Sequence, residues 1–154
     1  MAIIPAEVRE QLRLRFDARL SEPVQLQLFT RPGSSRLILP AGLGCATCED
    51  ARQILEALRD AAPEKITLEL IDVSQSAEIA AAAGVVDVPT IVVSGGTTDG
   101  RIRFQGLPTG TEFPALIDAI ERASRSETDL TPASLEALAR VIEPIELMVF
   151  ATPT

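Results

Sequence analysis

The sequence of 154 residues contains no histidine, tryptophan or tyrosine, and its aromatic residues are five phenylalanines. Without histidine the chain cannot build a Ser-His-Asp or Cys-His catalytic unit or the usual imidazole metal site, because these need a nitrogen base that titrates near neutral pH. Few aromatic rings leave little surface on which bases could stack, and the net charge of -8 repels a phosphate backbone. We therefore expect no nucleic-acid partner.

Long apolar runs are also missing. No stretch approaches the roughly 18 to 20 apolar residues of a membrane span, and Glu7 and Glu10 stand where a signal peptide has a basic segment followed by an apolar one. We therefore expect a cytoplasmic protein with no membrane partner. Hydrophobic residues make up 46% and charged residues 23%, which is typical of a folded domain. The length suits one domain of ordinary size, or one domain plus part of another.

The spacing of apolar residues predicts an α/β order of elements. Helical spacing predicts helices at 5–20, from Cys45 to before Pro63, at 77–83 and after Thr111, which we expect to cap its helix. Alternating or continuous apolar runs predict strands, at 24–28, 37–39, 66–73, 91–93 and 101–105. The last two strands are expected to form a hairpin.

The C-terminal part of the chain repeats an earlier part. Residues 143–153 match residues 22–32 at both prolines and at a Glu, a Leu and a Phe, and a helix is predicted before each copy. The later helix is expected to open at Thr131-Pro132 and to run to Ile142, followed by a strand at 145–150. We therefore divide the chain into a domain at 1–124, a linker at 125–130, and the helix and strand of an incomplete second unit at 131–154.

The two cysteines, Cys45 and Cys48, form a CxxC motif between a predicted strand and a predicted helix. Two intervening residues allow a disulfide to close over the first turn of a helix, where unpaired backbone N–H groups stabilise a thiolate. This position favours reversible redox chemistry. Two alternatives stay open. A zinc site would need two ligands from a second chain. The other alternative is a pair of inert thiols. A purely structural disulfide is disfavoured, because the cytoplasm is reducing.

Two acidic residues, Glu49 and Asp50, follow the motif directly. One hypothesis is that their charge opposes stabilisation of the Cys45 thiolate and so makes the couple reducing, in which case Glu49→Gln is more oxidising. The other is that both are ordinary first-turn acids that stabilise the helix.

These motifs resemble a known family. The CxxC at a helix start, the Val88-Pro89 dipeptide entering a later strand, and the following hairpin and helix resemble the thioredoxin fold. More narrowly, residues 102–113 and 149–154 resemble the glutaredoxin-like protein disulfide oxidoreductases, which carry two thioredoxin-fold units in tandem. The resemblance implies a thioredoxin-like α/β fold: a central mixed β-sheet flanked by helices, with an N-terminal helix and a C-terminal helix-strand extension.

The resemblance also implies a thiol–disulfide oxidoreductase that acts on protein or peptide disulfides and needs no cofactor and no metal. Cys45 would attack and Cys48 would resolve the mixed disulfide. Pro89 would be a cis proline facing the disulfide. The residues expected to contact the substrate are Val88, Pro89, Ala46 and Thr47. A thioredoxin-reductase-like flavoprotein would supply the electrons.

A second hypothesis comes from another class: a redox-inactive thioredoxin-like module for binding or dimerisation. Residues 145–150 alternate apolar side chains, so their strand is expected either to pair with another chain and form a homodimer or to dock on the first unit. The loop at 31–44, longer than is usual in the family, is expected to form an extra hairpin or to cover part of the cysteine pair.

Overall fold

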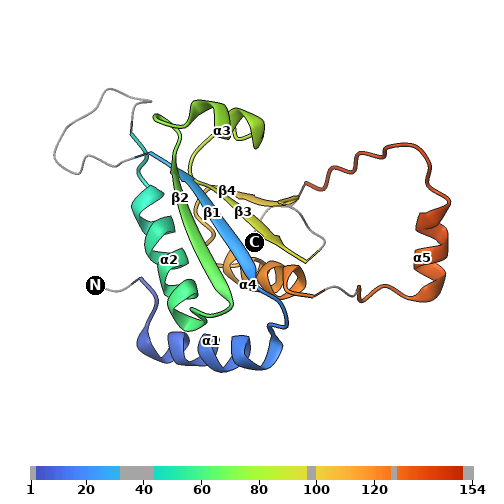
Figure 1. Ribbon diagram of the computed structural model, residues 1–154, viewed down its shortest axis with the longest axis horizontal. Helices are drawn as coiled ribbons and strands as arrows, with labels where there is room; N and C mark the ends of the chain where they lie inside the picture. Colours follow the sequence, from blue (N-terminus) through green and yellow to red (C-terminus); the bar gives the residue numbers. More distant parts are fainter. Residues whose placement is uncertain (1–2, 32–43, 97–99, 126–127, 151–154) are drawn as a thin grey trace.

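The computed structural model describes residues 3–31, 44–96, 100–125 and 128–150. Four strands in these residues form one mixed sheet, in the order β2-β1-β3-β4 (Figure 1). β1 (Val24–Thr30) lies inside the sheet, parallel to β2 (Ile66–Asp72) and antiparallel to β3 (Thr90–Gly95). β3 also pairs with β4 (Ile102–Gln105) as the expected antiparallel hairpin.

The helices cover the two faces of the sheet unequally. α1 (Ala6–Arg19), α2 (Cys48–Ala61) and α4 (Glu112–Ala123) share one large core with the inward side chains of the strands. α3 (Ala77–Ala82) packs on a smaller second core, formed by Phe29, Ile71, Ala80 and Val92. The thioredoxin-like arrangement of a mixed sheet flanked by helices is therefore confirmed.

The alternation of β1 follows from this arrangement. Leu26 and Leu28 are fully buried in the large core. Gln25 and Gln27 lie on the other face, where both side-chain amides donate to the carboxylate of Glu69, at 3.3 and 2.8 Å. The polar positions of the strand are thus satisfied outside the core, as a half-buried strand requires.

The C-terminal extension differs from the expectation. α5 (Pro132–Ala139) forms, and Thr131 caps it by accepting the backbone N–H of Ser134 at 3.2 Å, but it ends before Ile142. The prediction of a strand at 145–150 was wrong, because residues 143–150 adopt no strand. A strand needs a neighbour for its backbone N–H and C=O groups. α5 stands away from the sheet (Figure 1), and none of the four described strands pairs with residues 143–150.

Two further predictions concern the cap of α4 and the loop at 31–44. Thr111 precedes α4, yet its side chain makes no capping hydrogen bond. The strand expected at 37–39, and all of the loop at 31–44 except its two end residues, lie outside the described residues. No helix among those that are described is long and apolar enough to cross a membrane.

Candidate active site

The two cysteines form a disulfide at the start of α2. The Cys45 and Cys48 Sγ atoms are 2.02 Å apart, and their Cα atoms are 5.4 Å apart. Cys48 is the first residue of α2 and is only 2% exposed, whereas Cys45 precedes the helix and is half-buried. The helix therefore begins three residues later than its spacing predicts. Because the sulfurs are bonded to each other, this state of the pair does not offer thiolates to zinc.

The topology of the sheet brings the disulfide and the Val88-Pro89 dipeptide to the same end. β1 and β2 are parallel, so their C-terminal residues, Thr30 and Asp72, lie side by side, and the first residue of β3, Thr90, pairs with Phe29. α2 starts at this end of the sheet as well (Figure 1). Its inner face is fixed in the core by Ala51, Ile54, Leu55 and Leu58.

The segment that enters β3 is held by three hydrogen bonds. The Val88-Pro89 peptide bond is cis, as the resemblance implies, and Pro89 is buried. The Pro89 carbonyl accepts the Gly106 N–H at 2.8 Å. The buried Thr90 hydroxyl donates to the Asp87 carbonyl at 2.7 Å, and the Val88 N–H donates to the Asp87 side-chain carboxylate at 2.8 Å. The geometry of this segment is thus fixed on both sides of the proline.

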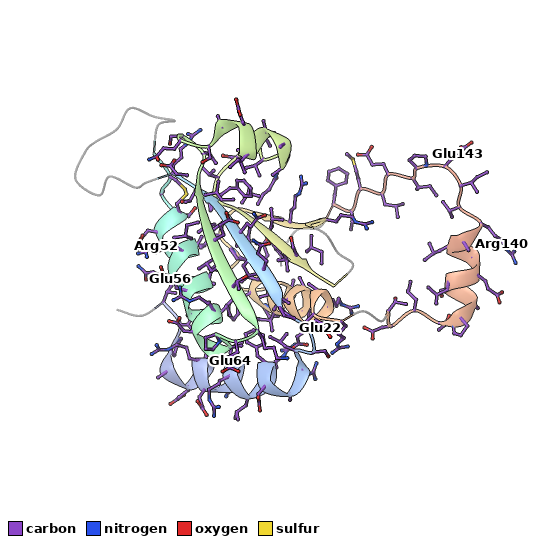
Figure 2. All side chains as sticks on the ribbon, viewed as in Figure 1. Glu22, Arg52, Glu56, Glu64, Arg140 and Glu143 are labelled. Carbon is purple, nitrogen blue, oxygen red and sulfur yellow. A yellow bond between two sulfur atoms is a disulfide. The ribbon has the colours of Figure 1, made fainter. Side chains whose placement is uncertain are left out.

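The acidic residues after the motif lie in an ion-pair cluster on α2. The Glu49 carboxylate accepts two hydrogen bonds from Arg52, at 3.0 and 2.6 Å, and one from Gln53 at 3.0 Å. These bonds, those from Arg52 first, lower the pKa of Glu49 to about 2. Arg52 also donates to Glu56 at 2.6 Å, and Figure 2 labels both side chains on the outer side of the helix.

Glu49 is therefore ionised and paired, and both hypotheses about its effect stay predictions. Arg52 is not among the residues predicted for the site. Its spacing three residues after Glu49 and four before Glu56 was the available signal, because such pairs lie on the same side of a helix.

Comparison with known proteins decides the family. A family model described as a thioredoxin domain matches residues 37–118, which is more than half of the chain. The chain belongs to the thioredoxin domain family. A thioredoxin from Methanocaldococcus jannaschii is 29% identical to this thioredoxin-domain protein over 99 residues, which are 64% of this chain and 94% of that relative.

Solved structures agree with this thioredoxin-domain assignment. A protein disulfide oxidoreductase from Aeropyrum pernix K1 has a TM-score of 0.72 at 25% identity, covering 89% of this chain and 55% of that one. An N-terminal domain of an alkylhydroperoxide reductase from Enterococcus faecalis has a TM-score of 0.65 at 22% identity, covering 86% and 58%, and shows the same fold. The chain thus spans little more than half the length of either solved protein.

The fold and the family expected from the sequence are confirmed. The family match, the relatives and the cysteine pair together identify a thiol–disulfide oxidoreductase domain. The individual roles expected of Cys45, Cys48, Val88, Pro89, Ala46 and Thr47 stay predictions.

Proposed function

We propose that the chain exchanges electrons with protein or peptide disulfides through the Cys45–Cys48 pair. The observation that carries this proposal is the unequal exposure of the two sulfur-bearing residues. Cys45 is half-buried and can be reached by a second molecule, whereas Cys48 is 2% exposed and can be reached only from Cys45. This order is what an attacking and a resolving thiol require.

In the reducing direction, the Cys45 thiolate attacks one sulfur of the substrate disulfide. A mixed disulfide forms, and the other substrate sulfur leaves as a thiolate. The Cys48 thiolate then attacks the Cys45 sulfur, which releases the second substrate thiol and closes the Cys45–Cys48 disulfide. Two electrons and two protons pass to the substrate, so no prosthetic group takes part. The same steps in reverse oxidise a dithiol.

For substrate binding, we propose that an extended segment lies between the disulfide and the cis proline. Support comes from the topology, which puts Val88 and Pro89 at the sheet end where α2 starts. The backbone of Val88 would pair with the substrate as an added strand. Ala46, which is exposed between the cysteines, and Thr47 would form the opposite side.

Two proposed partners follow the sequence hypotheses. A thioredoxin-reductase-like flavoprotein as electron donor is supported by the family resemblance. A homodimer through the C-terminal segment is supported by its exposed apolar side chains, among them Ile142 and Phe150, which are 91% and 90% exposed.

A redox titration with trapping variants tests the exchange reaction. In graded dithiol/disulfide buffers, alkylation followed by mass measurement should show a two-electron transition between roughly -270 and -120 mV. Cys48→Ser should accumulate a mixed disulfide with a cystine peptide, because the resolving thiol is missing, and Cys45→Ser should form none. Thiols that stay reduced in every buffer, with no trapping by either variant, would contradict the proposed function and favour the redox-inactive module. Equal trapping by both variants would contradict the assignment of Cys45 as the attacking thiol.

A further inference from the structure

A carboxylate occupies the backbone donor that a substrate strand would use. Asp87 Oδ1 accepts the Val88 N–H at 2.8 Å. The Asp87 side chain is exposed, whereas Val88 is half-buried and Pro89 is buried. The donor closest to the cis proline is therefore covered by an acidic group that is itself open to solvent.

The rest of the segment is held without this carboxylate. Thr90 donates to the main-chain carbonyl of Asp87 at 2.7 Å, and Gly106 donates to the carbonyl of Pro89 at 2.8 Å. Replacing the Asp87 side chain leaves both of these bonds in place. The carboxylate can therefore leave the Val88 N–H without releasing the loop.

We propose that Asp87 is a specificity-determining residue that selects disulfides flanked by lysine or arginine. This inference rests on the proposed function, in which a substrate carbonyl pairs with the Val88 N–H. A carboxylate is a stronger acceptor than a neutral carbonyl, so this exchange of partners is unfavourable for an uncharged substrate. A substrate cation that pairs with the displaced carboxylate offsets the loss, and a substrate anion adds repulsion.

The surroundings favour a cation brought by the substrate. Arg52, the basic residue near the start of α2, is already held between Glu49 and Glu56. Asp50 adds a further acidic side chain at the same helix end. An incoming lysine or arginine could therefore pair with the carboxylates of Asp87 and Asp50, which favour a cationic partner over an anionic one.

Peptide kinetics test this selectivity. Three cystine peptides that differ only in having Lys, Gln or Glu beside the half-cystine would be reduced by the wild-type chain, Asp87→Asn, Asp87→Ala and the control Asp17→Asn. Asp17 is an exposed acid on α1, so its variant makes the same change of net charge on a helix that does not carry the cysteines. Redox potential and thermal midpoint would be recorded for each protein.

The wild type and Asp17→Asn should prefer the Lys peptide to the Glu peptide by about tenfold in kcat/KM, the size of a charge-assisted contact in a partly exposed site. Asp87→Ala should reduce this preference to about twofold or less and lower KM for the Gln peptide by about threefold, with kcat, potential and thermal midpoint unchanged. Asp87→Asn should lose the charge preference but keep part of the higher KM, because its amide oxygen is still an acceptor.

An unchanged Lys-to-Glu ratio and an unchanged KM in both Asp87 variants would overturn the inference and leave the proposed exchange reaction intact. A changed potential or thermal midpoint in Asp87→Ala would also overturn it, since Asp87 would then serve the structure or the cysteines. If the wild-type chain reduces none of the peptides, the proposed function fails, and this inference fails with it.

Discussion

At the scale of single residues, the charge beside the cysteines is set by Arg52 together with Glu49. The Arg52 guanidinium contacts the carboxylates of Glu49 and Glu56, both at 2.6 Å. Removing Glu49 leaves Arg52 paired with Glu56, and removing Arg52 leaves both carboxylates uncompensated. The two changes therefore alter the local charge by one unit in opposite directions.

We predict that Glu49→Gln makes the Cys45–Cys48 couple more oxidising and that Arg52→Gln makes it more reducing. A more stable thiolate favours the reduced form, and the effect should be about 20 mV or less, because exposed charges contribute about 1 kcal/mol at most. The redox titration described above measures both shifts. Asp60→Asn is the control, since Asp60 pairs with Arg59 near the other end of α2. Shifts in the same direction would contradict the role of Arg52.

The charge of Glu49 should not vary with pH in the neutral range. Its hydrogen bonds lower the pKa to about 2, below the ordinary value of 4.5, so the ion pair is complete above pH 4.5 and is lost only as the pH falls toward 2. The difference in potential between wild type and Glu49→Gln should therefore change from about pH 5 to about pH 8 only as the Cys45 thiol ionises, because the charge acts on the thiolate. A difference that is as large where the thiol is protonated as where it is ionised would contradict action through the thiolate.

At the scale of elements, α1 is joined to α4 by ion pairs with a buried carboxylate. Glu121 of α4 is 3% exposed and accepts hydrogen bonds from Arg15 and from Arg19, the latter at 3.1 Å, and Arg15 also donates to Asp118 at 2.7 Å. The buried Glu121 carboxylate is satisfied by its two cationic partners. Removing the carboxylate or the arginines would lower the stability of the fold, because the remaining charge would lose its partner.

Glu121→Ala should therefore destabilise the protein by about 2 kcal/mol, since it leaves two guanidinium groups without this partner and a gap between the helices. Urea unfolding followed by far-ultraviolet circular dichroism measures this, because the chain has no Trp or Tyr to report by fluorescence. Glu10→Ala removes the partner of Arg13 from an exposed helix position, where solvent screens the ion pair, and should change stability far less. Equal effects of the two variants would remove the case for a structural role of the buried pair.

The elements also show what the sequence could and could not predict. The helices and strands of residues 5–124 that the structure describes follow from the periodicity, because each buries one face against the sheet or the helices. The expected strand at 145–150 copies the pattern of β1 but has no neighbour, and β1 owes its conformation to pairing with β2 and β3. Local pattern alone does not supply such partners.

The site was predictable to a similar degree. The cysteine pair and its place before a helix follow from motif and spacing, and the cis proline follows from the family resemblance. The hydrogen bond between Asp87 and the Val88 N–H depends on the side-chain and backbone angles of Asp87, so no side-chain pattern in the sequence indicates it.

At the scale of the whole molecule, the described C-terminal residues take no part in the core. Both core clusters lie within residues 4–123, and no residue described between 128 and 150 is buried. Large apolar side chains are instead open to solvent, with Leu147 86% and Val149 90% exposed. We predict that these side chains belong to an interface, because folded domains rarely leave several large apolar side chains open to solvent together.

A chain that ends at residue 130 separates the two hypotheses for this segment. If residues 131–154 serve self-association, the shortened chain should keep its urea midpoint and redox potential, and sedimentation of the full chain should show a dimer at high concentration that the shortened one lacks. If the segment instead docks on residues 1–124, the shortened chain should lose about 1 kcal/mol or more, because apolar surface that was covered becomes exposed, and both chains should stay monomeric. The structure, in which no described residue of this segment is buried, favours the first result.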